Sequence, residues 1–142
     1  MRRFFRASAS GEDDGEVLVD TSEGKYHVGE KWNYRTRPGE EDSLLTVVKV
    51  ESAPNVGVIV HASVEGLRVE NPGVPGGVSE RIHHMPFTEA AIDKSVTVLP
   101  ATGVPVTSDA EEAYENWRRA RGGVFTTTVA EAVELAAQAM SQ

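Results

Sequence analysis

The chain of 142 residues contains no cysteine. Disulfide bonds, thiolate zinc sites and cysteine nucleophiles are therefore excluded. The chain also lacks any apolar run near the ~18 residues that a membrane-spanning helix needs. Its basic start, residues 1–6, is not followed by the apolar core of a signal peptide. We therefore expect a cytoplasmic protein without membrane contact.

Sequence motifs for the common catalytic devices are missing as well. No Gly-x-Ser-x-Gly elbow occurs, and the glycine-rich residues 73–77 lack the Lys-Ser/Thr ending of a phosphate-binding loop. The stretch Glu80-x-x-His83-His84 does not have the spacing of a zinc protease. We predict no metal site and no cofactor.

The charge balance is acidic, with 14 Lys and Arg against 22 Asp and Glu and a net charge of −8. The acidic excess lies mainly at the two ends of the chain, and no basic stretch of the size that phosphate contacts require is evident. Nucleic acid is therefore disfavoured as a partner. A protein or a small molecule is expected instead, and association into a homo-oligomer is left open.

The pattern of the chain predicts an α+β fold. Residues 1–24 are interpreted as a mobile acidic segment in which an edge strand is an alternative, and residues 25–142 as a single domain. Apolar alternation and turn residues predict strands over 16–20, 25–36, 43–51, 58–64 and 67–70. Because hairpin-length connections join them, the sheet should be antiparallel, small and twisted, or curled into an open barrel of four to five strands.

The last third of the chain predicts about three helices. Thr88 is expected to cap a helix that runs to Leu99, and Ser108 with Glu111 to form a capping box for a second helix. Ala110, Ala113, Tyr114, Trp117 and Ala120 make one apolar face of that second helix. Thr128 with Glu131 predicts a third helix. Strands first and helices last predict helices that cover the sheet.

The histidines are the main candidates for chemistry. His61 lies inside an apolar strand, where a polar ring must find a hydrogen-bond partner, so it is either structural or part of a site. His84 precedes Met85-Pro86-Phe87, which should be extended and lead into a helix N-terminus. His84 either hydrogen-bonds a loop carbonyl or belongs to a binding site. Glu80 is the carboxylate that we expect beside these rings.

Two aromatics and an arginine complete the candidate ligand-binding residues. Trp32 and Tyr34 share one face of the predicted strand before the Pro38-Gly39 turn, so they either form core under the helices or line a pocket. Arg37 adjoins that turn.

These residues also carry a resemblance. The set consists of Val28, Gly29, Trp32, Tyr34, residues 36–41, Ser43, His61, Gly66, Leu67 and residues 84–87. In this respect the chain, from about residue 25 to its end, resembles a family of uncharacterised bacterial proteins. The resemblance implies a bacterial source and an independently folding unit, and it implies no activity.

We therefore expect a small non-enzymatic binding or accessory module. The alternative is a small hydrolase that uses His61 or His84 with a carboxylate, because histidine titrates near neutral pH and suits general acid–base catalysis.

Overall fold

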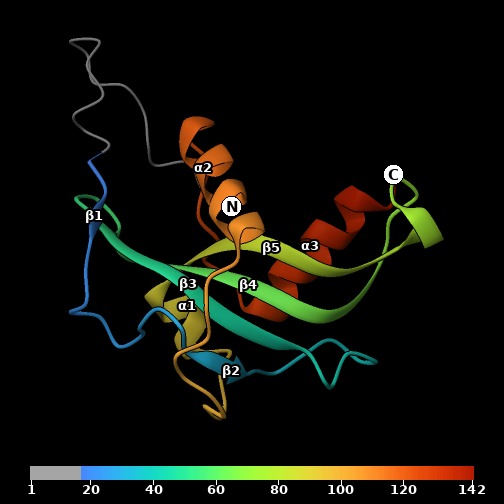
Figure 1. Ribbon diagram of the computed structural model, residues 1–142, viewed down its shortest axis with the longest axis horizontal. Coiled ribbons are helices and arrows are strands. Elements are labelled where there is room, and N and C mark those ends of the chain that lie inside the picture. Colours follow the sequence, from blue (N-terminus) through green and yellow to red (C-terminus); the bar gives the residue numbers. More distant parts are fainter. Residues whose placement is uncertain (1–16) are drawn as a thin grey trace.

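The computed structural model describes residues 17–142. In this part of the chain the α+β prediction is confirmed, with an open antiparallel sheet and three α-helices (Figure 1). The strands are β1 (Val19–Asp20), β2 (Lys31–Asn33), β3 (Leu44–Ala53), β4 (Gly57–Glu70) and β5 (Val78–Thr88). The helices are α1 (Glu89–Asp93), α2 (Ser108–Arg119) and α3 (Val129–Met140), with a 3-10 turn at Pro75–Gly77. Residues 1–16 of the predicted mobile segment, with its alternative edge strand, lie outside the described residues.

The sheet is built around two long central strands. Its order is β1-β3-β4-β5, and the short β2 also pairs with β3. Every pairing between these strands is antiparallel. The middle of β3 and of β4 is buried almost without alternation, because helices cover both faces of the sheet.

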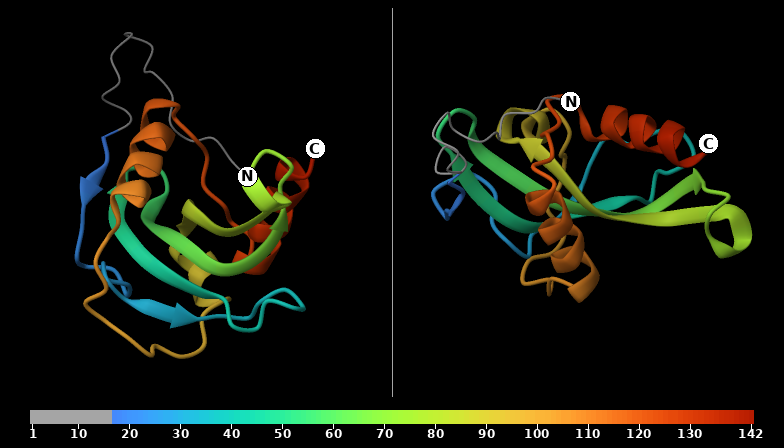
Figure 2. Two further views of the ribbon diagram at one scale, coloured as in Figure 1. Left: turned by 45° about the vertical axis from the view of Figure 1, so that its right-hand side comes forward. Right: turned by 90° about the horizontal axis from the view of Figure 1, so that it is seen from above.

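The two faces carry different cores. Helices α1 and α3 lie on one face and α2 on the other (Figure 2). The first face holds the large hydrophobic core, in which Leu45, Val60, Met85 and Phe87 pack against Ile92 of α1. Among the described residues, the face under α2 has a smaller apolar cluster of Ala53, Ile59 and Val124, with Leu18, Val56 and Trp117 packed against it. This second face has room for polar groups, and the candidate site lies there.

Three strand predictions need correction. Residues 58–70 form one strand rather than two, because Gly66 is a bulge and not a turn. Gly66 has φ +75°, and a Cβ there would lie 2.9 Å from Cα of Ser43, so the backbones approach closely. The predicted strand 25–36 keeps only Lys31–Asn33. Residues 78–88, which we did not predict as a strand, form β5.

The first helix is also shorter than predicted. Thr88 does cap it by accepting a hydrogen bond from the backbone N–H of Ala91. The helix ends at Asp93, because the chain then turns to pair with β2, with Thr97 donating to Asn33 and Asn33 donating to Val98. A helix to Leu99 would leave these β2 groups without partners.

The cap of α2 is Thr107 and not Ser108. The Thr107 side chain accepts from the backbone N–H of Ala110, whereas Ser108 is the first helical residue. We expect Thr107→Ala to lower the free energy of unfolding by about 1 kcal/mol through the lost cap. Ser108→Ala, the matched control, should change it by a few tenths at most. Urea unfolding measures both; a larger loss at Ser108 would contradict this assignment.

Candidate functional site

The register of the central strands brings Glu51, His61 and His84 together. A bulge between Val47 and Lys49 of β3 shifts the alternation, so that Glu51 points to the α2 face. Glu51 pairs with Ile59 on β4, and His61 pairs with Pro86 on β5. Glu51 and His84 are therefore both diagonal neighbours of His61, on opposite sides of it.

These three side chains form a continuous hydrogen-bonded chain. Nε2 of His61 lies 2.8 Å from Oε1 of Glu51, and Nδ1 of His61 lies 2.8 Å from Nε2 of His84. The two imidazole rings stack with their centroids 5.0 Å apart. His61 is fully buried and Glu51 is 2% exposed, whereas His84 keeps part of its surface open. A carboxylate and an imidazole are thus held inside the protein, and a second imidazole leads outward.

Helix α2 closes the cluster with two aromatic residues. Tyr114 donates a hydrogen bond from its hydroxyl to Oε2 of Glu51 at 2.5 Å, so both carboxylate oxygens have partners. The Tyr114 and Trp117 rings each meet His61 edge-on, with centroid distances of 4.9 Å. Gly122 permits this packing, because a Cβ there would lie 2.3 Å from the Trp117 ring. The name His–Glu cluster is used below for Glu51, His61, His84, Tyr114 and Trp117.

Burial sets the protonation state of the His–Glu cluster. It lowers the pKa of His61, although the Glu51 carboxylate opposes this effect, and it lowers the pKa of His84 to about 3. Burial also favours the neutral acid of Glu51, but the hydrogen bonds from His61 and Tyr114 outweigh it and keep the pKa of Glu51 below its ordinary value. Burial and the Glu51 contact raise the pKa of Tyr114. Near neutral pH the cluster therefore holds one carboxylate, two neutral imidazoles and a phenol.

One arrangement of protons satisfies all of these bonds. A carboxylate only accepts hydrogen bonds, so Nε2 of His61 must carry the proton that points to Glu51. Nδ1 of neutral His61 is then an acceptor, and Nε2 of His84 must donate to it. Neutral His84 consequently has its lone pair on Nδ1. The inner carboxylate thus determines the tautomer of the outer ring.

Glu80, the carboxylate that we expected beside the histidines, lies elsewhere. It makes no hydrogen bond to the His–Glu cluster, and Glu51 takes that place. Only His61 and His84 of the predicted trio converge. His84 bonds His61 rather than the loop carbonyl that was one alternative. His83 is not part of the His–Glu cluster, and its Nδ1 is buried without a hydrogen-bond partner among the described residues.

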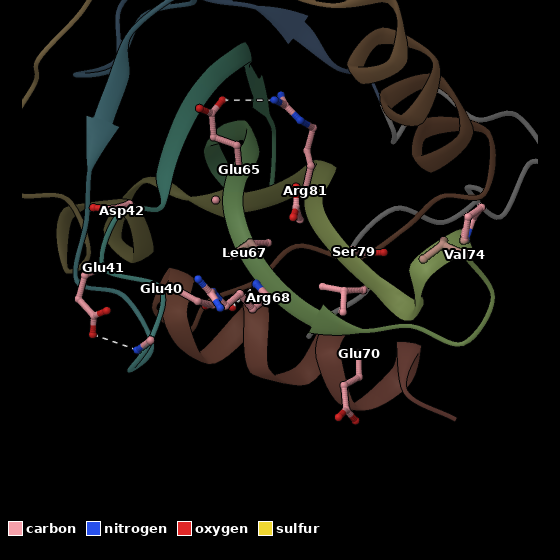
Figure 3. A pocket seen from close by; sticks show the side chains of 15 residues that line it. Glu40, Glu41, Asp42, Glu65, Leu67, Arg68, Glu70, Val74, Ser79 and Arg81 are labelled. Carbon is pink, nitrogen blue, oxygen red and sulfur yellow. Dashed lines mark hydrogen bonds and ion pairs between the residues drawn. The ribbon is translucent and has the colours of Figure 1, made fainter.

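Glu80 instead lines a separate hollow, here called the acidic groove. This hollow of about 1270 Å³ lies over β4 and β5 and the loop before β3 (Figure 3). Six carboxylates and two guanidinium groups line it: Glu40, Glu41, Asp42, Glu65, Glu70, Glu80, Arg68 and Arg81. Lys31 and Arg81 pair with Glu65 at 3.2 and 3.6 Å. Within residues 17–142, no ion pair reaches Asp42, Glu70 or Glu80.

Arg37 does not line the acidic groove itself, but it contacts Glu40, which does. Its guanidinium binds both oxygens of the buried Glu40 at 2.9 and 2.5 Å and reaches Glu134 of α3 at 2.9 Å. Glu40 also accepts from the backbone N–H of Arg68 at 2.7 Å. The hydrogen bond to Glu40 raises the pKa of Arg37. Arg37 therefore fastens the loop before β3 to β4 and α3.

Trp32 and Tyr34 belong to the large core and not to the groove. Tyr34 is 6% exposed and shares a 2.7 Å hydrogen bond with Oγ of Ser43. Trp32 packs on the same core and meets Tyr26 edge-on. Neither residue lines the acidic groove, so the core alternative describes both.

Comparison with known proteins adds no relative: no family of known sequences, no curated protein and no solved structure matches this chain. The bacterial family stays a prediction, as do the oligomeric state and the cytoplasmic location. No helix in residues 17–142 combines the length and apolar character needed to cross a membrane. In the same range, no three His, Asp or Glu side chains are arranged to hold a metal ion.

Proposed function

We propose that the protein is a binding module that holds a lysine-bearing or arginine-bearing polypeptide segment in the acidic groove. The observation that carries this proposal is the charge of the groove, where six carboxylates face two guanidinium groups. A surface of this sign attracts cationic partners and repels nucleic acid and other anions.

The carboxylates of the groove differ in how far the protein itself neutralises them. Glu40 is paired with Arg37, and Glu65 is paired with Lys31 and Arg81. Asp42, Glu70 and Glu80 have no such cation within the described part of the chain, and Glu70 and Glu80 are exposed. Unpaired carboxylates on a concave surface are available to a partner's ammonium or guanidinium groups.

The size of the acidic groove favours a polypeptide over a small molecule. Small-molecule sites enclose roughly 300–1000 Å³ and are mostly apolar. The acidic groove is larger, at about 1270 Å³, and its lining is mainly charged and polar. Its floor is the outer part of β4 and β5, which pair on both sides of a register shift between Glu65 and Val69. A rigid floor lowers the conformational cost of binding.

Fluorescence anisotropy with a fluorescein-labelled decalysine peptide tests the proposal. We expect the double variant Glu70→Gln/Glu80→Gln to bind roughly tenfold more weakly, since each exposed ion pair contributes up to about 1 kcal/mol. The control is Glu112→Gln/Glu115→Gln, which removes the same charge from the exposed surface of α2 and should leave the affinity close to wild type.

Salt should weaken the peptide binding, because exposed charges are screened. Equal losses in the two double variants would show that net charge, and not the groove, attracts the peptide. Absence of any binding by the wild-type protein would also contradict the proposal.

A further inference from the structure

The His–Glu cluster is chemically different from the acidic groove, and nothing in the proposed binding uses it. Its hydrogen-bonded chain begins at the buried Glu51 and ends at Nε2 of His84, and the other nitrogen of that ring is Nδ1. Within residues 17–142, no hydrogen bond reaches this nitrogen, and the His84 ring is partly exposed. The lone pair deduced for Nδ1 is therefore not used by any residue from 17 to 142.

We propose that Glu51, His61 and His84 form an acid–base site in which Nδ1 of His84 takes a proton from a water or hydroxyl group of a substrate beside α2. The proton on Nε2 of His84 then passes to Nδ1 of His61, 2.8 Å away. The charge ends on His61, where the Glu51 carboxylate at 2.8 Å offsets part of the cost of burial. In this scheme His84 is the catalytic residue, and His61 and Glu51 are positioning residues.

The arrangement follows the logic of a carboxylate–histidine pair that orients a base and accepts its charge. Two buried polar groups in direct contact cost stability unless fully hydrogen-bonded, and here each has its partners. Tyr114 meets both imidazole rings edge-on, and Trp117 meets His61 edge-on and His84 at a tilt, so the orientation of the His84 ring is fixed. Clusters of this kind, with strongly shifted titration, are concentrated at functional sites.

Within residues 17–142, the charged side chains that act on His61 and Tyr114 from outside the cluster are Lys49, Asp20, Arg118 and Glu115. Nζ of Lys49 lies 5.0 Å above the Tyr114 ring and pairs with Asp20 at 3.1 Å. Because Lys49 and Asp20 carry opposite charges, their electrostatic effects on the protonation of the two histidines partly cancel.

Hydrolysis of p-nitrophenyl acetate is the probe reaction for His84 as a base that activates water. An O–H bond of water breaks, its proton bonds to Nδ1 of His84, and its electron pair forms the bond to the acetyl carbon. The ester bond then breaks, and p-nitrophenolate leaves with that electron pair. The products are acetate and p-nitrophenolate, and the protons return to solvent.

We expect His84→Ala to lose at least about tenfold of the protein-dependent rate, and Glu51→Gln to lose a similar factor with the fold intact by circular dichroism. His27→Ala, at the exposed histidine, should leave the rate unchanged. The wild-type rate should also persist at pH 5, where an ordinary imidazole is protonated and inactive. A rate unaffected by His84→Ala would overturn the proposal.

Nitrogen NMR of the histidine rings provides a test that needs no folded His84 variant. In the wild-type protein at pH 7, Nε2 of both His61 and His84 should carry the proton. In Glu51→Gln, Tyr114 keeps donating to the side-chain oxygen, and the amide NH₂ faces His61. Both rings should then switch to the Nδ1–H tautomer. A wild-type His84 protonated on Nδ1, or no switch in Glu51→Gln, would overturn the relay.

Discussion

Replacing Glu51 with alanine is expected to lower the free energy of unfolding by about 3–5 kcal/mol, which is a large fraction of the stability of a domain of this size. The loss has two sources. The Nε2–H of His61 and the hydroxyl of Tyr114 both lose their acceptor in the protein interior, and a cavity remains between β3 and α2. Urea unfolding followed by tryptophan fluorescence measures the change.

Two further variants separate charge, hydrogen bonding and simple surface effects. Glu51→Gln keeps the side-chain volume and one hydrogen-bond acceptor for Tyr114. Its free energy of unfolding should therefore fall clearly less than that of Glu51→Ala. Glu112→Ala removes an exposed carboxylate from α2 and should change stability by less than about 0.5 kcal/mol. If Glu51→Ala lost no more than Glu112→Ala, the buried carboxylate would not support the fold.

Acid is expected to destabilise the protein in a pH range where carboxylates do not yet titrate. The pKa values of His61 and His84 lie below the ordinary 6.5 in the folded state, that of His84 at about 3. Below pH 6.5 the unfolded chain therefore binds protons that the folded chain refuses, and stability falls with falling pH. Between pH 7 and pH 5 each histidine that stays neutral should cost roughly 2 kcal/mol.

The carboxylates extend this loss at lower pH. The pKa of Glu51 is below 4.5 in the folded state, so its contribution is complete above that value and disappears only as pH falls further. Urea titrations at pH 7, 6 and 5 therefore isolate the histidines. His84→Gln should remove the roughly 2 kcal/mol that His84 contributes between pH 7 and pH 5. The same dependence on pH in the wild-type protein and in His84→Gln would contradict the pKa shift of His84.

The local signals of the chain predicted what local interactions control. Thr128 with Glu131 forms the capping box expected for α3, and Tyr114 and Trp117 lie on the inner face of α2 as the helical spacing indicated. The antiparallel sheet followed from hairpin-length connections. These features depend on neighbouring residues and on the side-chain period, which are visible in the sequence.

The partner of His61 could not be predicted in this way. Regular alternation along 43–51 places Glu51 on the same face as Leu45 and Val47, and only the bulge at Val47–Lys49 turns it to the α2 face. A bulge arises from the pairing with β4, and so it depends on contacts between strands. Glu80 was chosen because it is near His84 in sequence, but strand register, not sequence distance, determines which side chains meet.

By itself, the sequence determined the fold class, the two last helices and the exclusion of thiol chemistry, and it identified His61 and His84 as candidates. Only the tertiary structure decided that Glu51 completes the His–Glu cluster, that Glu80 belongs to the acidic groove and that Arg37 fastens a loop. The physical reason is the distance along the chain between the residues that interact. Caps, periodicity and turns are satisfied within a few residues, whereas buried carboxylates, bulges and ion pairs such as Arg37–Glu134 are determined by segments up to 97 positions apart.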